Sequence, residues 1–63
     1  MVERIITDVK GTPVAIIEEN EESVSTVVLK DGIPAFEITE VKLPGGKTKF
    51  QAKGAGWMTE HIE

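Results

Sequence analysis

Four lysines, a phenylalanine and a tryptophan lie close together in the segment Lys42–Trp57, KLPGGKTKFQAKGAGW. A protein that binds single-stranded nucleic acid needs cations that follow the phosphates and aromatic rings on which the bases stack. This segment contains both kinds of side chain, so one hypothesis is a small oligonucleotide-binding β-barrel. Its site would consist of Lys42, Lys47, Lys49, Lys53 and Trp57.

Two features favour a plainer interpretation of these lysines. Alternation along KTKFQAK puts its lysines and Gln51 on one side of a strand and Phe50 on the other, so we expect Phe50 in the core. The only arginine is Arg4, outside the segment, although arginine is the better residue for stacking and for gripping phosphate. The alternative is a solvated row of lysines that protects an edge strand from unwanted pairing.

Trp57 admits two roles in a chain with only three aromatic residues. It either closes one end of a small core as a large apolar cap, or it anchors a partner, because tryptophan is favoured in interface hot spots. The second interpretation gives a candidate partner-binding set of Trp57, Met58, Pro34 and Phe36. The partner is then a protein, either another subunit or a second copy.

The residues that usually perform catalysis or bind metals are scarce. His61 is the only histidine, no motif places a nucleophile or acid beside it, and there is no cysteine for a thiolate metal site or a disulfide. The acidic run around Glu18–Glu22 lacks the ligand spacing of a calcium loop, and the glycine pairs lack the ending of a phosphate loop. We therefore expect no catalytic residue, no metal, no cofactor and no enzymatic activity.

Length and charge limit the architecture. Sixty-three residues make one domain, 1–63, whose core is too small to be strongly stabilised without help from association. The formal net charge of −4 divides into −6 over residues 1–40 and +2 over residues 41–63, and such opposite charges favour contacts between subunits. No apolar run is long enough to span a membrane and no signal peptide is recognisable, so we expect a cytoplasmic protein that does not contact the membrane.

The fold is predicted from short β-rich runs separated by turn residues every eight to twelve positions, a rhythm typical of small barrels and sandwiches. The run PVAIIEE is apolar on both sides, which predicts a central strand covered on each face. The last run, WMTEHIE, is compatible with a strand or a short helical turn. We expect an all-β fold of five or six short antiparallel strands, arranged as a barrel-like meander or a compact two-layer sheet.

Asp31-Gly32 between two apolar runs is a strong hairpin signal, because a type I′ turn needs positive φ at both central residues. This turn predicts three cross-strand pairs, Leu29 with Pro34, Val27 with Phe36 and Ser25 with Ile38. Pro34 has no N–H, which places its part of the strand at a sheet edge or beside a bulge. The apolar phase slips later in the strand, which predicts a bulge near Thr39-Glu40.

The next hairpin has two candidate turns. A two-residue Gly45-Gly46 turn predicts the pairs Val41–Phe50, Leu43–Thr48, Lys42–Lys49 and Glu40–Gln51, and gathers the lysines on one outer face. A type II turn at Pro44-Gly45 would shift that pairing.

These observations favour a non-enzymatic protein–protein interaction or structural module. It would form a homo-oligomer or serve as a small accessory subunit of a larger assembly, of the kind found in regulators and in phage or prophage proteins. The oligonucleotide-binding barrel is the alternative.

Overall fold

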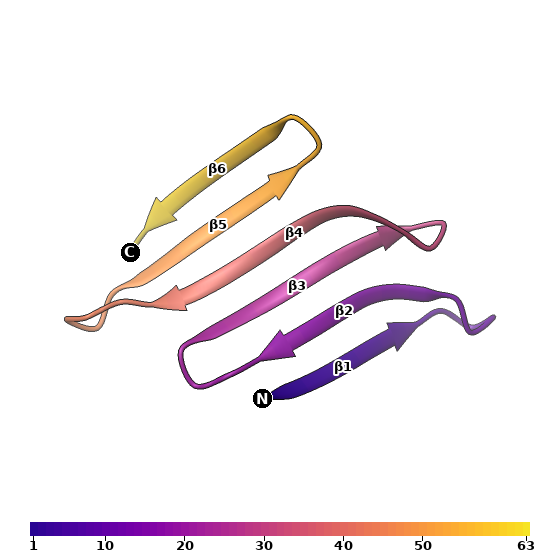
Figure 1. Ribbon diagram of the computed structural model, residues 1–63, viewed down its shortest axis with the longest axis horizontal. Coiled ribbons are helices and arrows are strands. Elements are labelled where there is room, and N and C mark those ends of the chain that lie inside the picture. Colours follow the sequence, from indigo (N-terminus) through magenta and orange to yellow (C-terminus); the bar gives the residue numbers. More distant parts are fainter.

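A computed structural model describes residues 1–63 and confirms the all-β antiparallel meander. Six strands form one sheet in the order β1-β2-β3-β4-β5-β6, so every strand pairs with its neighbours in sequence (Figure 1). The sheet stays open and does not close into a barrel (Figure 1). The final run is a strand rather than a helical turn. The strands are β1 (Val2–Thr7), β2 (Pro13–Glu19), β3 (Ser23–Lys30), β4 (Ile33–Lys42), β5 (Thr48–Gly54) and β6 (Trp57–Ile62).

The β3–β4 turn has the predicted geometry. Asp31 and Gly32 both adopt positive φ, 54° and 76°, as a type I′ turn requires. Leu29 pairs with Pro34, as expected from this turn. Aspartate tolerates the left-handed region better than most side chains and glycine carries no Cβ, so this dipeptide suits the turn.

Beyond this turn the predicted register is wrong by one residue. The structure pairs Val28 with Phe36, Val27 with Glu37 and Ser25 with Thr39. The register shifts between the Val28–Phe36 and Leu29–Pro34 pairs, which leaves Ala35 as the additional residue of a bulge. The bulge therefore lies next to Pro34, where the missing N–H interrupts the ladder, and not near Thr39-Glu40.

The β4–β5 hairpin uses the second of its two candidate turns. The N–H of Leu43 donates to the carbonyl oxygen of Lys47 over 2.8 Å, so three residues form the loop. Gly45 has φ 83°, the positive value that a type II turn requires after Pro44. The predicted Gly45-Gly46 pairing, including Lys42 with Lys49, is therefore wrong. The observed pairs are Lys42–Thr48, Val41–Lys49, Glu40–Phe50 and Thr39–Gln51.

Two polar side chains fix the remaining loops at the β1–β2 and β2–β3 connections. The Asp8 carboxylate accepts hydrogen bonds from the backbone N–H groups of Lys10 and Thr12, at 2.8 and 3.0 Å. Asn20 Oδ1 accepts hydrogen bonds from the N–H groups of Glu22 and Ser23, both at 2.9 Å. Such local bonds favour turns over a continued strand, and the acidic side chains of the β2–β3 turn are exposed.

The sheet is a single layer with principal extents of 43 × 28 × 14 Å. No residue is fully buried, and the half-buried ones are concentrated in β2, β3 and β5. The prediction for PVAIIEE is therefore wrong in part. Strand β2 lies inside the sheet between β1 and β3, but no second layer covers either of its faces.

Candidate interaction surface

The pairing register divides the side chains between two faces that differ in chemistry. Directly opposed residues of antiparallel strands share a face, and neighbours along a strand point to opposite faces. One face, which we call the apolar face, is formed by three rows that cross all six strands. The rows are Val2-Glu19-Val24-Glu40-Phe50-His61, Arg4-Ile17-Thr26-Ile38-Ala52-Thr59 and Ile6-Ala15-Val28-Phe36-Gly54-Trp57.

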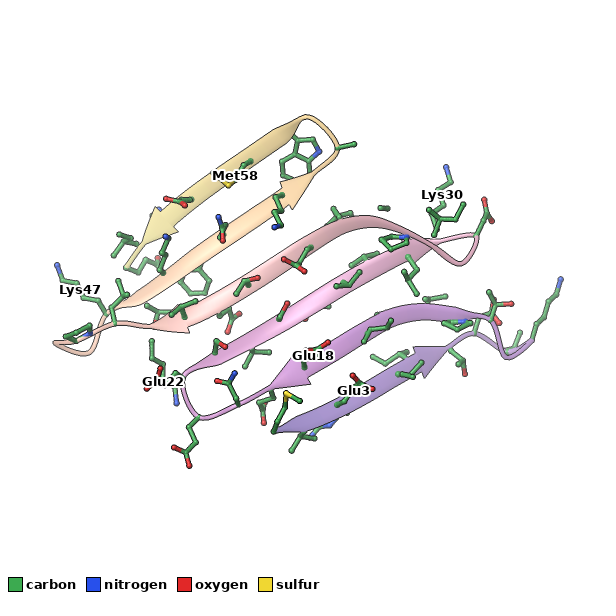
Figure 2. The ribbon with its side chains drawn as sticks, viewed as in Figure 1. Glu3, Glu18, Glu22, Lys30, Lys47 and Met58 are labelled. Atoms are coloured by element: carbon green, nitrogen blue, oxygen red, sulfur yellow. The ribbon has the colours of Figure 1, made fainter.

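The opposite face, the polar face, is the side seen in Figure 2, where Glu3, Glu18 and Met58 project from β1, β2 and β6. Its central row consists only of polar side chains, Glu3-Glu18-Ser25-Thr39-Gln51-Glu60. The next row across the strands consists of Ile5, Ile16, Val27, Glu37, Lys53 and Met58. The polar face thus combines a polar central row with flanking rows that mix charged and apolar side chains.

Ion pairs and hydrogen bonds link the charged side chains of the polar face. Lys49 Nζ lies 3.3 Å from Glu60 Oε1, and Lys53 Nζ lies 3.9 Å from Oε1 of Glu37, its partner across the ladder. Gln51 Nε2 donates to Glu60 Oε1 over 3.3 Å. Exposed pairs of this kind contribute only about 0–1 kcal/mol each to folding stability. They matter here because these charged groups already have ionic or hydrogen-bond partners within the chain.

All three aromatic residues of the chain, Phe36, Phe50 and Trp57, lie on the apolar face. Phe50 lies on the opposite face from Lys49 and Lys53, which confirms its predicted orientation. Its ring stacks with the cross-strand imidazole of His61, with ring centroids 6.5 Å apart.

Trp57 lies across its partner Gly54, and Phe36 pairs with the other side of the same glycine. A Cβ built on Gly54 would lie only 2.6 Å from Cε2 and 2.8 Å from Cζ2 of the indole. Because glycine has no side chain, the indole packs directly on the backbone of β5. Trp57 and Phe36 lie on either side of Gly54 at the β5–β6 turn end of the apolar face, and we call this pair the aromatic row.

The structure brings together part of the predicted partner-binding set. Trp57 and Phe36 share the apolar face, whereas Met58 points to the polar face. Pro34 lies beside the bulge on the side of the polar face, where it lines a shallow hollow with Glu37 and Lys53. On the apolar face the set is therefore reduced to Phe36 and Trp57, without Pro34 or Met58.

The five residues of the oligonucleotide hypothesis do not share one surface. Lys42 and Trp57 lie on the side of the apolar face, Lys49 and Lys53 lie on the polar face, and Lys47 precedes β5 in the turn. The predicted gathering of all these lysines on one face is wrong because the three-residue loop shifts the register by one. Strand β5 is also interior, paired with both β4 and β6, so its lysines do not protect an edge.

The side chains that could catalyse a reaction or bind a metal are dispersed over the sheet. His61 Nε2 lies 3.5 Å from Glu63 Oε1 at the exposed end of β6. No group of three or more histidine, aspartate or glutamate side chains is arranged to hold a metal ion. The structure also contains no helix with the length and apolarity needed to cross a membrane.

The apolar face carries large side chains that are exposed even in the middle of the sheet. Phe36 and Ile38 of β4 are 36% and 40% exposed, although β3 and β5 flank them on both sides. On the polar face the exposed large apolar side chains are Ile5, Met58 and Ile62, all in the edge strands β1 and β6. Sequence reasoning missed this contrast because it depends on the true register of β3, β4 and β5.

Comparison with known proteins identifies no relative. No family model, no curated protein and no solved structure matches the chain.

Proposed function

We propose that this chain is a non-enzymatic structural or interaction module that acts by protein–protein contact through its apolar face. Uncovered Phe36 and Ile38 at the centre of one face, against an ion-paired opposite face, are the observation that carries this proposal.

The physical reason is that a domain normally packs two layers around its core. A sheet with one apolar face is stable when that face is buried against another element. All six strands of residues 1–63 belong to a single layer, so none of them covers the apolar face. We propose that a partner protein supplies the covering layer.

The aromatic row is suited to anchor such a contact. Tryptophan is enriched in interface hot spots, and Trp57 is 48% exposed beside Phe36. Large exposed apolar patches on soluble proteins mark contact sites, because each buried aromatic or branched side chain contributes about 1.5–3 kcal/mol.

Two single-cysteine variants test whether the apolar face is covered in solution. The chain has no cysteine, and Gln51 and Ala52 are adjacent half-buried residues of β5 that point to opposite faces. We expect the thiol of Ala52→Cys to react with a disulfide reagent about tenfold more slowly than that of Gln51→Cys, because only the first is shielded by the contact.

The unfolded variants supply the reference, since both thiols should then react at the same rate. Equal rates in the native proteins, both alone at concentrations up to the solubility limit and in a lysate of the source cells, would show that nothing covers the apolar face and would remove the proposal.

A further inference from the structure

We infer that the occupant of the apolar face is a second copy of this chain, stacked face to face so that two sheets form one β-sandwich. This inference rests on the proposed function and specifies its partner.

The solvent-exposed area of the single chain exceeds that of a compact protein of the same mass by about one such interface. The chain exposes 4889 Å², whereas a compact protein of 6.9 kDa would expose about 4,000 Å². The difference of about 900 Å² is close to the roughly 800 Å² that each partner contributes to a stable interface of standard size. One partner of equal size on one face thus restores the exposure expected of a compact protein.

The shape of the sheet suits a copy of itself. Its face measures 43 by 28 Å, which provides room for an interface of that area. Two sheets stack with their strands within about 30° of each other and their backbones about 10 Å apart, which leaves space for one interdigitated layer from each. Two-fold symmetric dimers are also the commonest oligomers, because one patch then serves both partners.

The charges on the two sides favour the apolar face for self-association. On the apolar side the sheet carries Arg4, Lys30 and Lys42 against Glu19 and Glu40, so both signs are present in nearly equal number. The polar side carries four carboxylates, those of Glu3, Glu18, Glu37 and Glu60, and only two lysines, Lys49 and Lys53. Two polar faces would therefore repel each other, whereas two apolar faces meet with mixed charges.

Pairing between the open edges of β1 and β6 is the competing arrangement of two copies. It would extend the sheet and satisfy edge backbone groups. It would also leave Phe36 and Ile38 of every copy exposed to water, because both lie in a strand that is already paired on each side. Face-to-face stacking removes these side chains from water, and for that reason it is the favoured arrangement.

Light scattering with a matched pair of lysine variants tests the inference. We expect the native chain to have twice its 6.9 kDa mass at high micromolar concentration. Ile38→Lys puts a charge in the middle of the apolar face and should weaken the dimer by about a hundredfold or more. Thr39→Lys makes the same addition on the polar face of the same strand, and its dimer should persist.

A second measurement uses the unaltered chain, so that unfolding caused by Ile38→Lys is not mistaken for dissociation of the dimer. Equal amounts of isotope-labelled and unlabelled protein are mixed, and intermolecular NOEs are recorded selectively. Contacts between copies should join the methyl groups of Ile17, Val28 and Ile38. Intermolecular contacts confined to β1 and β6, or to polar-face side chains, would overturn the inference.

The outcomes separate this inference from the proposed function. A monomer at every concentration whose Ala52→Cys thiol becomes shielded only in the presence of a different protein would refute the second copy and leave the interaction module standing. A monomer whose thiols on both faces are equally reactive, alone and in the lysate, would refute both.

Discussion

Replacing Gly54 with valine is expected to lower the free energy of unfolding by about 1–3 kcal/mol, the usual range for overfilling a packed position. The new Cβ would overlap the indole of Trp57, which lies directly on this glycine. The ring must swing away, and it then loses its contact with β5 and its place beside Phe36. Urea unfolding followed by the fluorescence of this single tryptophan measures both effects, since the emission should shift toward that of exposed indole.

Ala52→Val is the matched control for this prediction. Ala52 lies two residues earlier on the same strand and the same face, between Ile38 and Thr59. Valine suits a strand and meets no indole there, so stability should change little. If Gly54→Val were as stable as the parent with unchanged emission, the packing of Trp57 on the glycine would be wrong.

Deleting Thr39 is expected to lower the free energy of unfolding by about 1.5–3 kcal/mol, because no register of β4 then keeps both of its halves on their present faces. Without Thr39, Ile38 becomes the direct neighbour of Glu40, and neighbours in a strand point to opposite sides. Either Phe36 and Ile38 move to the polar face, or the end of β4 reverses instead. In the proposed dimer, each large apolar side chain that leaves the covered face forfeits about 1.5–3 kcal/mol. The urea midpoint, again followed by Trp57 emission, measures the loss.

Deleting Ala35 is the matched comparison. Removing this bulge residue leaves Leu29 opposite Pro34 and Val28 opposite Phe36 in one regular ladder, with every face preserved. The expected change is about 1 kcal/mol or less. A reversed order, with the Thr39 deletion tolerated and the Ala35 deletion severe, would show that the bulge lies near Thr39 after all.

The sequence was sufficient to predict features that depend on local chemistry. Asp31-Gly32 specifies a type I′ turn through its backbone preferences, and the alternation in β5 sets Phe50 opposite Lys49 and Lys53. The number of strands follows from the spacing of turn residues. Each of these features depends on a few neighbouring residues.

The register across β3 and β4 could not be predicted in the same way. Val27 and Val28 are both apolar, so a shift of one residue still pairs Phe36 with a valine and the pattern carries no penalty. The bulge at Ala35 arises from Pro34, but the proline alone does not specify on which side the additional residue falls. The β4–β5 loop was ambiguous because two adjacent glycines permit positive φ at either position.

The assignment of the candidate surface depended on these same registers. Trp57 and Phe36 were identified from residue type alone, as large apolar side chains suited to a contact. That they share one face on either side of Gly54, and that Met58 faces the other way, follows only from the pairing of β4, β5 and β6. Alternating apolar residues also do not reveal whether the second layer of a sheet comes from the same chain or from another.

The most direct test of the central claim, that this sheet is stable because a second copy covers its apolar face, is the dependence of thermal unfolding on protein concentration. Unfolding coupled to dissociation is opposed by mass action, so the midpoint temperature should rise steadily over a hundredfold increase in concentration. Thr39→Lys should show the same rise. A midpoint that is constant across that range, with a monomeric mass throughout, would contradict the account.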